Sequence, residues 1–202
     1  MSENNILQYT PKVWQTAELL ISAGIKQSDC PKYMMPFFCL ILLESRMLRA
    51  VKELFGESDL LATCQNKRNE ITSAFDGLGI GFNQGILFQG KSLNRIVQDQ
   101  SSFAEQFLEY LLGFDAMTQK VLGIDVSGGE VRLNLKSVIK ELKAKKILFS
   151  TVKKWSEIDL TSFDNSAVTT LEEHIKRKWA DISAETSGEQ YTPHDVIKII
   201  SE

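Results

Sequence analysis

The chain has 202 residues, of which 43% are hydrophobic and 24% are charged, with a formal net charge of −3 and a pI near 5.6. This length suits one domain, or one domain with part of another, and the composition is that of a globular protein that buries a core without cross-links. The longest apolar run, YMMPFFCLILL, covers 11 residues and is too short to cross a bilayer. The N-terminus, MSENNILQ, lacks the basic start of a secretory signal, so a cytoplasmic protein without membrane contact is predicted.

Cysteine and histidine are sparse. Cys30, Cys39 and Cys64 form no C-x-x-C pair, and we interpret them as reduced structural thiols. The chain has two histidines and no group of residues with metal-ligand spacing, so no metal site is predicted. His174 has no serine or cysteine nucleophile near it in the sequence and is interpreted as a surface or packing residue.

Helical signals dominate the first third of the chain. Thr10 and Pro11 predict a helix start, with Thr10 as the capping residue, and Gly24 predicts the end of that helix. A second, longer helix is predicted from near Pro36 to Gly56. Its apolar positions recur at steps of three and four residues: Leu40, Leu43, Met47, Val51 and Leu54.

A glycine-rich connection, FDGLGIGFNQGILFQG, follows at residues 75–90. Phe75, Gly77 and Gly79 match the F-x-G-x-G pattern of methyltransferase cofactor loops. Such a loop works between a buried strand and a helix N-terminus, where backbone amides approach the ligand. The preceding residues, NKRNEITSA, do not form a buried-strand pattern, so we interpret the segment as a link between helices.

Three more helices are predicted in the second half. Ser102 and Glu105 form the pattern of a capping box at the start of one, and Asp164 or Asn165 caps another. Two short extended pieces are expected near Ile86–Phe88 and Leu148–Val152. The apolar stripes of the last two helices are Leu135, Val138, Ile139 and Leu142, and Val168, Leu171, Ile175 and Trp179. The predicted fold class is all-α, a multi-helix bundle with a glycine-rich connection.

Basic residues concentrate between Val131 and Trp155. This stretch holds eight basic residues and one acidic residue, an excess of +7 in a chain whose total is −3. Arg132, Lys136, Lys140 and Lys143 share one helical face opposite the leucine stripe. A solvated helix face is one interpretation, and contact with a phosphate backbone is the other.

The last residues, SGEQYTPHDVIKIISE, have the pattern of a loop entering a helix. Thr192 caps the helix, Pro193 occupies its first position and Asp195 its third. The amides exposed at such a helix start suit a carboxylate or another polar ligand group.

This tail and the helix before it, DNSAVTTLEEHIKRKWADISAETSGEQYTPHDVIKII, resemble the segment that leads into the catalytic domain of type I restriction-modification methylase (M) subunits. That family commonly has a helix, a link ending in G-E-[HFQ]-[FY]-T-P and an apolar helix, and this chain has G-E-Q-Y-T-P at residues 188–193. WSEIDL, SLNRIV, FAEQFLEYLLGF and VWQTAELL are similar to other family segments. The resemblance covers most of the chain and is most specific in residues 155–200.

The resemblance implies a helical N-terminal domain at residues 1–163, then a connecting helix and the start of an α/β methyltransferase domain at residues 164–202. The parent subunit would transfer a methyl group from S-adenosylmethionine to adenine N6 in DNA, with the base extruded from the duplex. DNA, the specificity subunit and the restriction subunit are the implied partners. His194 departs from the arginine that often follows T-P in the family. The implied cofactor contacts are Glu189, Gln190, Tyr191, Thr192, Pro193 and His194.

Catalysis in that family requires a D-P-x-x-G-S-G loop and an N-P-P-[FYW] motif. The four prolines of this chain are all separated, so N-P-P is absent. We therefore expect the chain to be the helical domain with the first residues of a truncated catalytic domain. It would contain no catalytic residue, and it would show no methyltransferase activity and negligible cofactor binding by itself.

Two functions remain open from the sequence. In the first, the chain clamps DNA and meets the specificity subunit, with the basic face from Arg132 to Lys146 as the DNA contact. In the second, it is a non-enzymatic helical protein-interaction module. The second is supported by the apolar helix Tyr33–Phe55, which contains methionine, and by the acidic pI.

Overall fold

The structure is a computed structural model that describes residues 6–56, 59–78, 87–124 and 133–187; for residues 76–78 and 181–187 it describes the backbone alone. All regular structure in those ranges is helical, with no strand among them, which confirms the predicted all-α class. The chain divides into two compact units, Pro11–Ser162 and a smaller unit of Met1–Thr10 with Phe163–Glu202.

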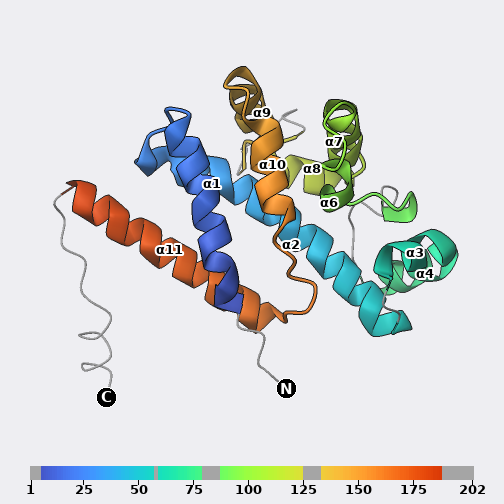
Figure 1. The fold of residues 1–202 in the computed structure, drawn as a ribbon. Coiled ribbons are helices and arrows are strands. Elements are labelled where there is room, and N and C mark those ends of the chain that lie inside the picture. Colours follow the sequence, from blue (N-terminus) through green and yellow to red (C-terminus); the bar gives the residue numbers. More distant parts are fainter. Residues whose placement is uncertain (1–5, 57–58, 79–86, 125–132, 188–202) are drawn as a thin grey trace, which may run out of the picture. The chain divides into compact units, whose positions relative to one another are not determined.

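The larger unit is built around α2, a 26-residue helix. In Figure 1, α3 and α4 lie beside the C-terminal end of α2, and α9 and α10 lie nearer its N-terminal half. Helix α6 packs against both α7 and α10. The bounds of the helices are α1 Thr10–Ser22, η2 Gln27–Asp29, α2 Cys30–Phe55, α3 Leu60–Asn66, α4 Arg68–Leu78, α6 Leu93–Ile96, α7 Phe103–Leu112, α8 Ala116–Leu122, α9 Leu135–Ala144 and α10 Leu148–Ser156.

The start predicted for the long helix near Pro36 is wrong. Helix α2 begins at Cys30, with Pro31 in its first turn, where a proline leaves no extra donor unpaired. Pro36 lies inside the helix and cannot donate to the carbonyl one turn back. The helix continues through it because Met34 and Phe37, on either side, are both buried in the core.

The predicted glycine ends of the first two helices are confirmed. Gly56 caps α2 in the left-handed conformation, at φ +65°, and its N–H donates to the carbonyl of Lys52. Gly24 follows α1 at φ +81°. The last residue predicted for the stripe of α2, Leu54, is 46% exposed, so its place in the core is wrong, whereas Leu40 and Val51 are buried.

Two side-chain caps differ from the prediction. Thr10 is the first residue of α1, and its buried Oγ1 has no hydrogen-bond partner among the described residues. Ser102 does precede α7, but its hydroxyl donates to Asp99 and accepts from Gln106, each at 2.6 Å. In a capping box this hydroxyl would accept from the Glu105 N–H; here it accepts from the side-chain amide of Gln106, so no capping box forms.

The two extended pieces predicted from the sequence are also wrong. Helix α10 occupies Leu148–Ser156, because Thr151, Val152 and Trp155 recur at helical spacing and are buried together. Residues 87 and 88, the described part of the other piece, are helical. Helix α4 extends to Leu78, so the predicted link begins later than Phe75, and no buried strand precedes the glycine pattern.

The smaller unit consists of α11 (Asn165–Ser187) packed against η1 (Ile6–Tyr9). Asp164 caps α11 as predicted, since its Oδ1 accepts from the Ala167 N–H at 2.8 Å. The rings of Tyr9 and Phe163 meet edge to face at 6.0 Å between centroids. The predicted apolar face is confirmed by the burial of Leu171, Ile175 and Trp179.

Candidate functional site

The basic face predicted from the sequence lies on α9. Asn134 caps this helix by accepting from the Ser137 N–H at 3.2 Å. Leu135, Val138 and Leu142 are buried beneath it. This orientation leaves three lysines exposed along one face, which we call the lysine stripe: Lys136, Lys140 and Lys143. Arg132, the fourth predicted member, lies outside the described residues.

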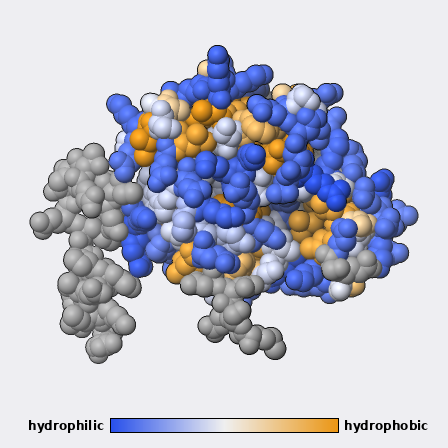
Figure 2. All heavy atoms as spheres, in the orientation of Figure 1, coloured by the Kyte–Doolittle hydropathy of each residue, from blue (hydrophilic) through white to orange (hydrophobic). Residues whose placement is uncertain are grey.

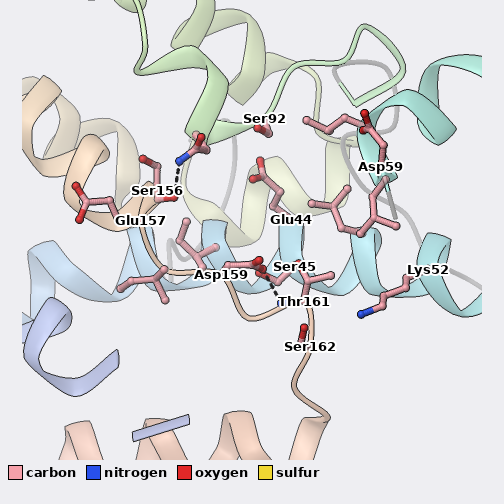
Figure 3. Close-up of a pocket in the computed structure, with 16 residues that line it drawn as sticks. Glu44, Ser45, Lys52, Asp59, Ser92, Ser156, Glu157, Asp159, Thr161 and Ser162 are labelled. Atoms are coloured by element: carbon pink, nitrogen blue, oxygen red, sulfur yellow. Dashed lines mark hydrogen bonds between the residues drawn. The ribbon is translucent and has the colours of Figure 1, made fainter. Parts of the chain in front are cut away.

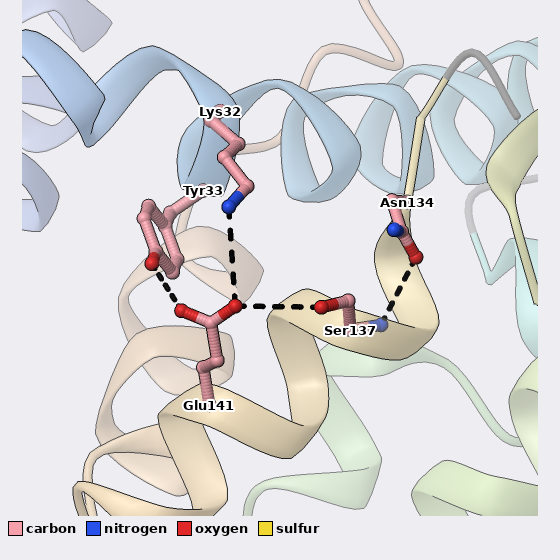
Figure 4. A network of polar contacts seen from close by, with 5 residues as sticks. All are labelled: Lys32, Tyr33, Asn134, Ser137 and Glu141. Atoms are coloured by element: carbon pink, nitrogen blue, oxygen red, sulfur yellow. Dashed lines mark hydrogen bonds and ion pairs between the residues drawn. The ribbon is translucent and has the colours of Figure 1, made fainter.

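A polar network on the other side of α9 attaches it to α2 (Figure 4). The Tyr33 hydroxyl donates to one carboxylate oxygen of Glu141. The other oxygen accepts from the Ser137 hydroxyl at 3.3 Å and lies 3.9 Å from the Lys32 ammonium. The hydrogen bond to Glu141 is the main reason why the pKa of Tyr33 rises to about 12, and it also lowers the pKa of Glu141. The network therefore fixes which face of α9 is left for the lysines.

The other lysines of the basic stretch have different surroundings. Lys145 donates to the carbonyl of Ala23 at 2.9 Å, so its charge stabilises the C-terminal end of α1. Lys154 is half-buried, whereas Lys146 and Lys153 are exposed. Of the described lysines of this stretch, three thus form the stripe and Lys145 contacts α1.

A polar cavity of about 780 Å³, which the sequence did not predict, lies between α2, α6 and the segment that follows α10 (Figure 3). Four acidic side chains and one lysine are among its lining residues. Its polar lining consists of Glu44, Ser45, Lys52, Asp59, Ser92, Asn94, Ser156, Glu157, Asp159, Thr161 and Ser162.

Glu44 is the most perturbed group in this cavity. It rises from α2 toward Ser92 in Figure 3, and its carboxylate accepts from the Leu93 N–H at 2.9 Å. Desolvation raises the pKa of Glu44 to about 7, and the negative charge of Asp159 adds to the rise, whereas hydrogen bonds from Leu93 and Tyr110 oppose it. The one sequence signal for this group is an acidic residue directly after an apolar run, at a position that helical spacing turns toward the core.

Most of the other polar groups around the cavity support the local structure. Asp59 and Ser92 cap α3 and α6, and the Ser45 hydroxyl accepts from the Leu160 N–H. Within the described residues, no three His, Cys, Asp or Glu side chains are placed to hold a metal ion. The cavity is therefore best understood as a junction with one carboxyl group that changes its charge near neutral pH.

The six cofactor contacts implied by the resemblance, residues 189–194, lie outside the described residues. His174 is half-buried on α11. Cys30 and Cys64 are buried, and desolvation raises the pKa of each thiol to about 11, which makes them poor nucleophiles. Every helix in the described ranges is too short or too polar to cross a membrane.

Comparison of the chain with protein-family models, with curated proteins and with solved structures gave no match.

Proposed function

We propose that this chain is the helical N-terminal region of a type I restriction-modification DNA methylase subunit, which holds the DNA backbone and assembles with the specificity subunit. In this proposal the parent subunit methylates adenine N6 with S-adenosylmethionine, and residues 189–194 contribute to the cofactor site. The resemblance of residues 155–200 to the family supports the assignment. The structural observation that carries the DNA contact is the lysine stripe on α9.

The spacing of the stripe suits a phosphate backbone. Lys136 and Lys143 are seven residues apart, which is about 10 Å along a helix axis. One strand of a duplex presents about three phosphates over that distance. The hydrogen bond from Tyr33 to Glu141 attaches α9 to α2 and leaves the lysine stripe facing outward. The stripe can therefore meet DNA without rearrangement of the core.

Charge reversal tests the DNA contact. Replacing all three lysines of the stripe by glutamate should weaken binding to unrelated duplexes alike and should reduce the slope of log K against log salt by up to about 3. Anisotropy titrations of labelled duplexes with the 202-residue chain over a range of salt concentrations measure both quantities. Reversal of the exposed Lys26, Lys52 and Lys120 is the charge-matched control. Equal effects of the two triple variants, or none, would refute the assignment.

The second candidate function, a helical protein-interaction module, is favoured by a different observation. An apolar groove lies directly beside the lysine stripe, between α7 and the helix pair α9–α10. The phosphate backbone proposed to meet the stripe offers no apolar surface to cover such a groove. The two functions are compatible, since the groove and most of the stripe use different residues.

A further inference from the structure

The groove has a volume of about 380 Å³, and we define it by six of its lining residues. Three aromatic rings line it, those of Phe103, Phe107 and Phe149, and we call them its floor. The exposed side chains of Leu108, Lys143 and Lys146 also line it, and we call these its edge. All of these residues belong to the larger unit of the fold.

Helix α7 has more apolar surface than the core covers. Phe103, Phe107 and Leu111 face inward and are buried, but Leu108 and Leu112 are 56% and 57% exposed. The apolar arc of α7 therefore continues past the core boundary, and Leu108 carries it to the groove, whereas Leu112 does not line the groove. Figure 2 shows several separate apolar areas within a mostly hydrophilic surface. Scattered apolar residues are common on protein surfaces, whereas contiguous apolar surface in a groove indicates a binding site.

The floor of the groove is preformed. The rings of Phe103 and Phe107 are stacked, with centroids 5.4 Å apart and planes 13° apart. The ring of Phe149 meets Phe103 edge to face at 5.1 Å and 82°. These contacts hold the floor in place before any partner arrives, which lowers the entropy cost of binding.

The charge at the edge has one sign. Among the described residues that line the groove, the charged ones are Lys143 and Lys146, both exposed. Lys146 adopts φ +59°, a left-handed conformation in which a side chain is unfavourable and which glycine occupies most easily. Lys146 thus places a long basic side chain at the edge of the groove although glycine would suit its backbone conformation better. This cost in stability is consistent with a role for the charge in binding.

We propose that the groove binds an amphipathic helix of a partner protein, with apolar residues on the aromatic floor and acidic residues against Lys143 and Lys146. A concave apolar site of this size accepts one or two anchoring side chains, as in helix-in-groove recognition. Duplex DNA would satisfy the lysines and leave Leu108 uncovered. A bilayer would meet the exposed side chains and leave the floor unfilled. The inference is independent of the methylase assignment.

Selection from a displayed library of helical peptides about four turns long, using the full 202-residue chain as bait, tests the proposal. Enriched peptides should carry apolar residues at i, i+3 or i+4, flanked by Asp or Glu. For a selected peptide, Leu108→Gln should weaken binding about tenfold or more, and Leu54→Gln, a matched change at a 46% exposed leucine on α2, should leave it unchanged. Lys146→Gly should weaken binding several-fold while raising the melting temperature, which separates lost binding from lost folding.

Several results would overturn the proposal. One is that no peptide is enriched more with the wild-type chain than with Leu108→Gln as bait. The others are that the enriched peptides are basic or uncharged, or that Leu108→Gln does not weaken their binding. A different occupant would be indicated if the chain bound no peptide and Leu108→Gln weakened another interaction. The groove would then be assigned to whichever binding was weakened: that of duplex DNA, of phosphatidylserine vesicles or of a second copy of the chain. Charge reversal at Lys136 and Lys140, which do not line the groove, should affect DNA and not the peptide, so the two proposals fail separately.

Discussion

The carboxyl group of Glu44 makes the stability of the fold depend on pH in an unusual direction. Its pKa is about 7 in the folded chain, against an ordinary value of 4.5. Between these values the unfolded chain releases the proton and the folded chain keeps it. The free energy of unfolding contributed by this group therefore falls as pH rises from about 4.5 to about 7, and the contribution is largest below its ordinary pKa.

The size of the effect follows from the two pKa values. A tenfold difference in proton affinity corresponds to about 1.36 kcal/mol, so a pKa of about 7 in place of 4.5 sets an upper limit of about 3 kcal/mol. Glu44 is half-buried and lines a polar cavity, so solvent screening lowers the expected loss to about 2 kcal/mol. Glu44→Gln keeps an oxygen to accept from the Leu93 N–H and carries no charge at any pH.

Urea unfolding at a series of pH values, followed by circular dichroism, measures this contribution. The wild-type chain should lose stability between about pH 4.5 and about pH 7 relative to Glu44→Gln, and the two curves should converge below about pH 4.5. Glu157→Gln, at an exposed position on the same cavity, is the control and should follow the wild type. Parallel curves for wild type and Glu44→Gln across the whole range would show that the folded chain does not hold this proton.

Two further predictions concern the scaffold. Tyr33→Phe removes the hydroxyl that donates to Glu141 and should lower the free energy of unfolding by about 1 kcal/mol, measured by urea titration, because the carboxylate stays partly solvated. No loss would mean that water replaces this hydrogen bond without cost. Gly56→Ala and Gly90→Ala should each cost about 1 kcal/mol, because both glycines have φ near +70°. A Cβ at Gly90 would also lie 2.5 Å from the Gln65 amide, but that exposed side chain can move; a much larger loss for Gly90→Ala in thermal melts would show that it cannot.

The sequence predicted the fold class and several helix ends because those features depend on local chemistry. Helical spacing of apolar residues, glycine after a helix and Asp164 before one act within a few residues of the chain. The sequence predictions were wrong where contacts between distant parts of the chain determine the local structure. The sequence predicts a helix start near Pro36, because nothing in it shows that Met34 and Phe37 are buried on either side of this proline.

The candidate sites divide in the same way. The exposure of Lys136, Lys140 and Lys143 followed from their position opposite a leucine stripe, which needs only the helical period. The polar cavity did not follow, because Glu44 meets Leu93, Tyr110 and Asp159 from distant parts of the chain. The basic face predicted from the sequence runs to Lys146 and includes Lys145, because a sequence does not show its hydrogen bond to Ala23, which lies 122 positions away.

Lys143 belongs both to the lysine stripe and to the edge of the apolar groove. An acidic helix in the groove would pair with this lysine and remove one of the three charges available to a phosphate backbone. Because linkage is reciprocal, DNA on the stripe would weaken the helix by the same factor. If both proposals hold, a partner of this chemistry would do more than add a contact, since it would also lower the affinity of α9 for DNA.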